Sequence, residues 1–377
     1  MTDPVYLDYN ATTPVDPRVL DAMLPWLREG FGNPSSDHVY GQRAKAAVDT
    51  ARAQVAELIG ARPEEIVFTG CATEANNLAL QGVARALKDG GRAGLRYSAV
   101  EHPSVTQPMG CLGEEGWAVS ELPVDGTGRV DPAGLRFGAD VALVSVMLAN
   151  NEVGTIQPIR AIADLAHGVG ALMHIDAAQA VGKIAVAVND LGADLLTLAG
   201  HKFYAPKGVG ALYVRSGTPI RAIQQGASHE RGLRPGTENV PHIVALGEAA
   251  RLARESLAQE VARLTRLRDD LHRGLAAAIP GLVLNGHEKE RLPNTLNLSF
   301  PGIDGWRLLA AAPDLAASTG SACHTGQHAV SGVLGAMGCA PERARGAVRL
   351  SLGRFTGKAE IAQATASLVA AWRLLAA

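Results

Sequence analysis

The sequence has few cysteines, few aromatic residues and no excess of charge of either sign. Its four cysteines are spread over 377 residues without a CxxC pair or the spacing of a zinc finger. This scarcity argues against a disulfide scaffold and against a structural metal site, and we predict neither. The 35 lysines and arginines are balanced by 37 aspartates and glutamates, so no basic field indicates a nucleic-acid partner.

Long hydrophobic runs are also missing. No apolar stretch reaches the roughly 20 residues that a membrane-spanning helix needs, and the opening Met1-Thr2-Asp3-Pro4 lacks the basic and apolar regions of a signal peptide. We therefore expect a cytoplasmic protein with no membrane partner. Hydrophobic residues make up 47% of the chain and glycine occurs 42 times, a balance typical of an α/β enzyme with a large buried core.

Apolar runs of strand length alternate with segments of helical period through most of the first 250 residues. This alternation predicts βα units and a mainly parallel sheet. One intervening helix is expected at 159–167. The runs predicted as strands are Ile66–Thr69, 95–100, Val141–Met147, 172–175, 195–198 and Gly210–Val214.

The pattern changes at Val240–Ala278, which has the period of one long charged helix. We interpret this helix as the connection to a second domain. The chain would then divide into a large domain, residues 16–250, and a smaller α+β domain, residues 1–15 with 251–377. The strands and the closing helix predicted in the second part are 295–300, Ala347–Ser351 and 358–375.

Leu198-Ala199-Gly200-His201-Lys202-Phe203-Tyr204 ends an apolar run with a histidine and a lysine. Lysine is rarely buried beside apolar residues unless a partner pairs with it or bonds to it covalently. One candidate for such a partner is pyridoxal phosphate (PLP), held by Lys202 as a Schiff base.

A second segment supports that hypothesis. Met173-His174-Ile175-Asp176-Ala177-Ala178-Gln179 ends a short apolar strand in an acid, two small residues and an amide. A carboxylate in this place can keep a pyridine nitrogen protonated, which makes the cofactor an electron sink. A further strand-like run separates Asp176 from Lys202, so the acid and the amine are expected at neighbouring strand ends.

Thr69-Gly70-Cys71-Ala72-Thr73-Glu74-Ala75-Asn76-Asn77 follows a predicted strand and precedes a helical segment. The free backbone N–H groups and the dipole at such a helix start form an anion site that suits a phosphate. Thr and Glu at this spacing also form an ordinary capping box. Both interpretations stay open at this point.

Two polar segments follow other strand-like runs. Glu101-His102-Pro103-Ser104 offers a histidine that can stack on a planar cofactor or move protons, and Asn150-Asn151-Glu152-Val153-Gly154 ends the run at Val141–Met147. Ligands gather at such strand ends in open α/β sheets. The alternatives are a structural or exposed histidine and a plain turn of Asn and Gly.

Arginines stand in two polar segments. Arg354 follows the strand-like run at Ala347–Ser351, and a guanidinium fork is well matched to a substrate carboxylate. Arg231 and Arg234 form a similar cluster with Thr237. The alternatives are a surface arginine and a solvated loop.

Cys323 lies in a run of small residues, 317–326, that suits a mobile loop. A thiol with a pKa of about 8.5 is only a few per cent ionised near neutral pH, so a nucleophilic role needs help from His324 or from a bound cofactor. The alternative is a flexible connection with an incidental thiol. The other three cysteines are expected to be small buried residues.

Together these segments closely resemble the cysteine desulfurases of the NifS/IscS-like group, within the class V aminotransferase superfamily of fold-type I PLP enzymes. The resemblance runs nearly end to end, and its most specific motifs are Gly200-His201-Lys202, Asp176 with Gln179, and Gly320-Ser321-Ala322-Cys323. It implies a large domain with a mainly parallel seven-stranded sheet flanked by helices, a smaller α+β domain, and a homodimer.

The resemblance also implies a role for each site residue. Lys202 would hold PLP and remove the Cα proton of L-cysteine, and Cys323 would take the sulfur as a persulfide. His102 would stack on the ring and carry protons. The residues implied for the cofactor are Ala72, Thr73, His102, Asn151, Asp176 at the pyridine nitrogen, Gln179 at the ring hydroxyl, His201, Lys202 and, from a second subunit, Thr237. Those implied for the substrate are Asn33, Asn151 and Arg354.

Three features depart from the family pattern, one of which is 225–230 in place of a Gly-rich lead into the arginine loop. Ala199 stands where relatives typically carry a serine, which removes one hydroxyl from the phosphate site, and Cys323-His324 is similar to selenocysteine lyases. A selenocysteine lyase, an aminotransferase and an inactive PLP-fold scaffold protein are therefore the alternatives. The sulfur acceptor, a protein or a small thiol, and the pathway it serves, such as iron-sulfur cluster assembly, stay open.

Overall fold

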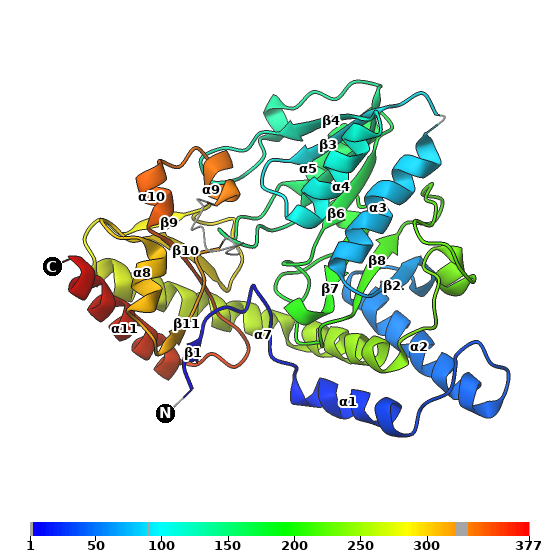
Figure 1. Cartoon of the computed structure of the whole chain (residues 1–377), viewed down its shortest axis with the longest axis horizontal. Coiled ribbons are helices and arrows are strands. Elements are labelled where there is room, and N and C mark those ends of the chain that lie inside the picture. Colours follow the sequence, from blue (N-terminus) through cyan, green and yellow to red (C-terminus); the bar gives the residue numbers. More distant parts are fainter. Residues whose placement is uncertain (1–2, 89, 321–330, 377) are drawn as a thin grey trace.

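The computed structural model describes residues 3–88, 90–320 and 331–376 (Figure 1). Within these residues the centre is a seven-stranded sheet in the order β2-β8-β7-β6-β5-β3-β4. Its strands are β2 (Ile66–Thr69), β3 (Gly94–Ser98), β4 (Ala118–Leu122), β5 (Val141–Met147), β6 (Leu172–Asp176), β7 (Leu195–Ala199) and β8 (Gly210–Val214). Among them β8 pairs antiparallel with β2 and β7, and the other neighbouring pairs are parallel. The predicted seven-stranded, mainly parallel sheet is confirmed.

The strands form where apolar runs are covered on both faces. All seven residues of β5, VALVSVM, are buried, as expected for a central strand of a parallel sheet. The predicted run at 172–175 extends by one residue to Asp176, and the run at 195–198 extends by one to Ala199. Asp176 is therefore the last residue of strand β6 and does not belong to the loop after it.

Helices cover both faces of this sheet (Figure 1). On one face, α3 (Ala72–Leu87) and α4 (Pro103–Glu114) bury apolar side chains against the strands. On the other face a larger apolar cluster joins the sheet to five helices. These are α1 (Pro17–Arg28), α2 (Val39–Leu58), α5 (Ile159–Gly168), α6 (Val188–Leu191) and the first part of α7 (Val240–Ala278).

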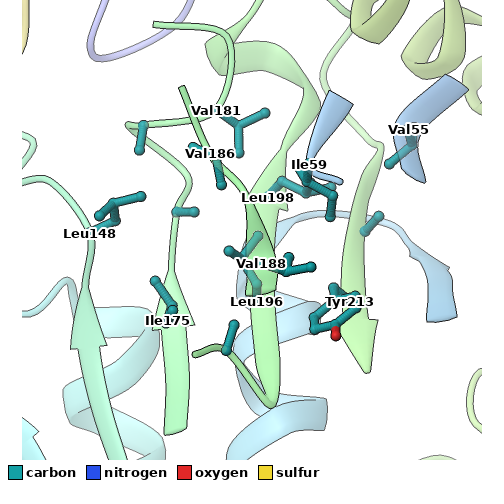
Figure 2. Packing of buried hydrophobic residues seen from close by; sticks show 14 of the residues in the cluster. Val55, Ile59, Leu148, Ile175, Val181, Val186, Val188, Leu196, Leu198 and Tyr213 are labelled. Atoms are coloured by element: carbon teal, nitrogen blue, oxygen red, sulfur yellow. The ribbon is translucent and has the colours of Figure 1, made fainter. Parts of the chain in front are cut away.

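The larger cluster shows how the second face is packed. Figure 2 shows Val55 and Ile59, from the end of α2, together with Leu196 and Leu198 of β7 and Tyr213 of β8. The four aliphatic side chains are essentially removed from water, since each is at most 2% exposed. Burial of this kind stabilises the fold by about 2 kcal/mol for each large side chain, so the cluster holds the strands in a fixed position.

A smaller group of strands and helices lies around the second half of α7. In the described residues it contains an antiparallel sheet in the order β12-β10-β9 and a parallel pair, β1 with β11. Its strands are β1 (Val5–Tyr6), β9 (Val283–Asn285), β10 (Thr295–Ser299), β11 (Leu315–Ala316) and β12 (Ala347–Ser351). Its helices are α8 (Gly305–Ala310), α9 (Gly332–Ala336), α10 (Pro341–Arg345) and α11 (Lys358–Ala376).

The long helix α7 contributes to the apolar clusters of both groups. Leu246 and Leu252 belong to the cluster under the large sheet, whereas Leu264 and Leu271 belong to the cluster of the smaller sheet. Figure 1 shows the helix running from one group to the other. Along the described chain, no helix is both long enough and apolar enough to cross a membrane.

Candidate active site

The carboxyl ends of four parallel strands bring the predicted site residues to one edge of the large sheet. His102 follows β3, Asn151 follows β5, Asp176 ends β6 and Lys202 follows β7. Open α/β sheets bind their ligands at this edge. The charges of Asp176 and Lys202 both act on His102, so the fold brings these three groups together although the chain separates them widely.

Lys202 lies in a short 3-10 turn directly after β7. Its Nζ donates to the backbone oxygens of Asn10, at 2.7 Å, and Ala11, at 2.8 Å. Burial, reinforced by the nearby Arg349 guanidinium, lowers the pKa of Lys202 to about 8. A free amine is therefore accessible near neutral pH, as a Schiff-base lysine or a general base requires.

Asp176 has its two carboxylate oxygens held by separate donors. Oδ1 accepts from the backbone N–H of Ala178 at 2.9 Å, and Oδ2 accepts from Nδ2 of Asn76 at 2.8 Å. Both hydrogen bonds fix the position of the carboxylate, and the side chain is buried. Asn76 was not predicted as a site residue, because its contact with Asp176 spans 100 residues of chain.

His102 caps the first turn of α4. Its Nδ1 accepts from the backbone N–H of Ser104 at 3.1 Å and lies 2.9 Å from the Ser104 hydroxyl. As a residue His102 is exposed, yet desolvation of the imidazole lowers its pKa, Lys202 lowers it further, and Asp176 opposes both. Ser104 was not predicted either.

The start of α3 offers unpaired donors. Among the described residues, the backbone N–H groups of Ala72 and Thr73 donate to no protein acceptor. Glu74 accepts from the N–H of Gly70 at 2.7 Å, and Cys71 caps the helix by accepting from the N–H of Glu74. The Glu74 carboxylate thus folds back to the residue before the N-cap, where it also pairs with Arg234 at 2.8 Å. The N–H groups of Ala72 and Thr73 stay available to an anion.

The cysteines differ from the expectation. Cys71 and Cys111 are exposed and Cys339 is half-buried, so the prediction that these three are small buried residues is wrong for the first two. Cys71 is exposed because it stands at the helix start, outside the apolar face of α3. Cys323 lies outside the described residues.

His201 and Gln179 flank the lysine. His201 Nδ1 is 3.2 Å from the hydroxyl of Thr12, and burial together with nearby lysine charges lowers the pKa of His201 to about 4. Gln179 donates to the backbone oxygen of Asn10 at 2.9 Å. Both side chains are therefore uncharged hydrogen-bonding groups beside Lys202.

Lys183 is a second buried lysine, which the sequence analysis did not single out. Its Nζ donates to Gln179 Oε1 at 2.5 Å and to Asn10 Oδ1 at 3.1 Å, and burial lowers its pKa well below the ordinary value. The reasoning used for Lys202 would have found it, because Val181-Gly182-Lys183-Ile184 also sets a lysine among apolar residues.

Arg354, which the sequence analysis predicts as the partner of the substrate carboxylate, forms its contacts within the protein. Its guanidinium pairs with Asp16 at 2.5 Å and covers the ring of Tyr204, 4.4 Å from the ring centroid. Asp16 is buried and also accepts from the Arg18 guanidinium at 2.8 and 2.9 Å, so Arg354 is part of a network of ion pairs around this buried carboxylate. This pairing argues against a contact between Arg354 and a substrate carboxylate.

Arg349, five residues earlier, is the arginine that reaches the site. It lies on β12, is 5% exposed, pairs with Asp8 at 2.7 Å and donates to the backbone oxygen of Asn151 at 3.1 Å. Its Nε is buried without a hydrogen-bond partner in the described part of the chain. The sequence signal was a charged residue in the middle of the apolar strand Ala347–Ser351.

The remaining predicted residues are on the periphery. Asn33 is exposed and closes a local turn by accepting from the N–H of Ser35. Thr237 is exposed on the loop that precedes α7. Between residues 3 and 320, neither side chain forms a hydrogen bond with another predicted site residue.

The donor set fits PLP. The two free N–H groups of α3 and the neutral His201 suit a phosphate, Gln179 suits a ring hydroxyl, and the fixed carboxylate of Asp176 suits a protonated ring nitrogen. The amine of Lys202 lies among them, half-buried and with a lowered pKa.

The comparisons with known proteins agree with this site. The sequence model of the aminotransferase class-V family matches residues 5–363, and the chain belongs to this family of PLP-dependent fold-type I enzymes. Within it, the chain is 46% identical over 366 residues to cysteine desulfurase IscS of Anaeromyxobacter sp. (strain Fw109-5), covering 96% of this chain and 90% of that protein. It is 44% identical over 363 residues to the human cysteine desulfurase, covering 95% and 79%.

Solved structures give the same result. A NifS-like protein superposes with a TM-score of 0.90 at 37% identity and covers 99% of each chain. DndA from Streptomyces lividans superposes with a TM-score of 0.78 at 38% identity, covering 90% of this chain and 97% of the other. The predicted resemblance to the NifS/IscS-like group, the fold class and the cofactor of the family are confirmed.

Proposed function

We propose that this chain is a PLP-dependent cysteine desulfurase, which converts L-cysteine to L-alanine and holds the sulfur as a persulfide on Cys323. The observation that carries the proposal is the cluster at the strand ends, where a half-buried lysine of lowered pKa lies beside Asp176 and His102. The relatives named cysteine desulfurase, which match over nearly the whole chain, support the choice of substrate.

Lys202 and Asp176 would perform the first proton transfer. PLP, when bound, supplies an electron sink for the carbanion at Cα. Lys202, uncharged in an appreciable fraction of molecules because its pKa is about 8, takes the Cα proton on Nζ. Asp176, whose oxygens accept from Asn76 and Ala178, would hold the ring nitrogen of the bound cofactor, and His102 would stack on its ring.

We assign the substrate carboxylate to Arg349 in place of Arg354. Arg349 is buried, carries an unpartnered Nε and acts on Lys202 through its charge. A contact with Asn151 supports this assignment, because the backbone oxygen of Asn151 accepts from the Arg349 guanidinium at 3.1 Å. A buried guanidinium with a free donor suits a carboxylate.

The phosphate would be held by the N–H groups of Ala72 and Thr73 and by His201. We propose that the enzyme is a homodimer and that Thr237 of a second subunit completes this phosphate site. The exposure of Thr237 and Asn33 supports a role that needs a second copy or the arriving substrate.

Cys323 would complete the reaction. Its thiolate would attack the sulfur of the bound cysteine, so that the S–S bond forms as the Cβ–S bond breaks. The electron pair stays on Cβ, which takes up a proton, and Lys202 returns to Cα the proton that it removed. The products are L-alanine and the Cys323 persulfide, so no outside oxidant or reductant is needed. The terminal sulfur then passes to a protein acceptor or a small thiol.

The test is incubation of the purified holoenzyme with L-cysteine. We expect stoichiometric alanine in the first turnover and one added sulfur atom on the peptide that contains Cys323, found by mass spectrometry. Alanine without added sulfur on this peptide would contradict the nucleophile, and no alanine at all would contradict the function. L-selenocysteine as a parallel substrate separates a desulfurase from a selenocysteine lyase.

We also propose the division into residues 16–250 and residues 1–15 with 251–377, in a protein of the cytoplasm. Two separate apolar clusters support the division, since the first ends along α7 near Ala253 and the second begins near Leu264. The pairing of β1 with β11 supports the assignment of the N-terminal arm to the smaller part.

A further inference from the structure

A line of hydrogen bonds joins Asp176 to His102. Nδ2 of Asn76, on α3, lies 2.8 Å from Oδ2 of Asp176 and 2.8 Å from the hydroxyl of Ser104. That hydroxyl lies 2.9 Å from Nδ1 of His102. Asn76 and Ser104 are 0% and 7% exposed, so water hardly competes for these bonds.

The chemistry of the groups fixes the orientation of Asn76. An ionised carboxylate only accepts hydrogen bonds, so the amide nitrogen, and not the amide oxygen, must face Asp176. The two hydrogens of this nitrogen serve Asp176 and Ser104. The opposite atom, Asn76 Oδ1, is buried and has no partner among the described residues, which is the cost of this orientation.

The same reasoning fixes the proton on His102. The backbone N–H of Ser104 points at Nδ1 from 3.1 Å, and a backbone N–H can only donate. The Ser104 hydroxyl accepts from Asn76, and its own hydrogen can be donated to Nδ1. Nδ1 must therefore keep its lone pair, and the single proton of the neutral ring must be on Nε2.

The surroundings disfavour a second proton on this ring. His102 is the N-cap of α4, where the positive end of the helix dipole opposes a cation. Lys202 also opposes a positive charge on the ring and Asp176 favours it, while desolvation makes the largest contribution and lowers the pKa of His102.

We propose that Ser104 holds His102 as a neutral imidazole with its proton on Nε2, so that His102 presents a hydrogen-bond donor to the bound substrate, and that Asn76 links this state to the Asp176 carboxylate. The inference rests on the proposed function, because it defines what His102 offers to the amino acid in that site. The predicted role of His102 as a proton carrier is thereby assigned to one atom, Nε2, which acts as a hydrogen-bond donor. Ser104 and Asn76 are positioning residues in this arrangement.

The experiment is 15N NMR of the histidine side chains in the holoenzyme, with His102 assigned by its loss in His102→Gln. At neutral pH we expect a pyridine-type resonance for Nδ1 and a pyrrole-type resonance for Nε2. In Ser104→Ala, loss of the hydroxyl donor should move the Nδ1 resonance and raise the titration midpoint of His102 by about half a pH unit. Ser104→Thr keeps a hydroxyl and should restore both values.

Thr106→Ala is the matched control, since Thr106 lies on the same helix outside this line of hydrogen bonds, and it should leave His102 unchanged. A proton on Nδ1 in the wild-type enzyme, or an Nδ1 resonance that does not move in Ser104→Ala, would overturn the inference. The resonances do not depend on turnover. If cysteine is not converted to alanine, the proposed function fails, whereas a wrong tautomer in an active desulfurase removes this inference alone.

Discussion

Glu101, the residue before His102, is a carboxyl group that the fold buries beside the site. One oxygen accepts from the Ser98 hydroxyl at 2.5 Å and from the Met147 N–H at 2.6 Å. The other oxygen is buried without a partner among the described residues. Burial raises the pKa of Glu101 to about 8, so the folded protein keeps this carboxyl protonated at neutral pH.

This burial predicts a pH-dependent loss of stability. Between the ordinary value of 4.5 and about 8, the folded state binds a proton that the unfolded chain has released, so stability falls as the pH rises. Glu101→Gln mimics the protonated form. It should remove that fall and leave the variant more stable than the wild type at pH 8, by roughly 1 to 3 kcal/mol.

Urea unfolding at several pH values between 5 and 9 measures this difference. Glu114→Gln, at an exposed glutamate of α4, is the control and should follow the wild type. Parallel curves for Glu101→Gln and the wild type would show that the buried carboxyl does not titrate as described.

Substitutions of Arg349 and Arg354 should have different effects, the first on the KM for L-cysteine and the second on the melting temperature. Arg349→Gln removes the free donor near Lys202, so the KM for L-cysteine should rise by about tenfold to a hundredfold. Arg354→Gln breaks the pair with the buried Asp16, so its main effect should be a lower melting temperature. Steady-state kinetics and calorimetry on both variants test this, and a KM effect confined to Arg354→Gln would reverse the assignment.

At this scale the sequence predicted the residues that follow apolar runs at strand ends, among them Lys202, Asp176 and His102. It could not predict Asn76, whose role depends on how α3 packs beside β6. For the substrate carboxylate it predicted Arg354 and did not single out Arg349. The two residues differ in position, because Arg349 alternates with apolar neighbours on β12 and Arg354 lies in the turn after this strand.

Among the elements, the 3-10 turn η4 (His229–Gly232) has a strained backbone, and an ion pair holds this turn in place. Glu230 and Arg231 have φ angles of +47° and +56°, a region that residues with a side chain seldom occupy. The Glu230 carboxylate is 1% exposed, and it accepts from both terminal nitrogens of Arg52, on α2, and from the N–H of Phe68, on β2. The turn is thus fixed to a helix and to a strand of the large sheet.

Removal of Arg52 should therefore destabilise the protein strongly. Arg52→Met leaves the buried Glu230 charge without its partner, which costs about 3 to 5 kcal/mol. Lys45→Met is the matched control on the same helix, because Lys45 pairs with Asp49 in solvent and such pairs contribute about 1 kcal/mol or less. Urea unfolding of both variants measures the contrast, and equal effects would show that the buried pair has no special role.

The elements were unequally predictable. Six of the seven strands of the large sheet were predicted, because buried strands are continuous apolar runs. Strand β4 was not predicted, because most of its residues are exposed and its sequence has no such run. Helix α4 gave a poor signal, since it begins at Pro103 and contains Pro108, which ordinarily interrupts a helix. Helix α2 is rich in alanine and charged residues, so its buried stripe shows little contrast in hydrophobicity. Its burial depends on α7, which lies far along the chain.

For the molecule as a whole, α7 is the element that both sheets share. Its 39 residues give a length of nearly 60 Å at about 1.5 Å per residue. Arg263 of α7 donates to the backbone oxygens of Gly353 and Thr356. The segment after β12, which contains Arg354, is therefore fixed to the same helix that packs under the PLP site.

Asn10 connects the first residues of the chain to the candidate active site. Its backbone oxygen accepts from Lys202 and Gln179, and its side-chain amide meets Lys183, Asn294 and Thr295. A protease that trimmed the first dozen residues would spare every group that touches substrate. It would nevertheless remove the backbone oxygens that accept from Lys202 Nζ and the amide that bonds to Lys183 and Asn294, so we expect the nearly full-length product to lose its activity.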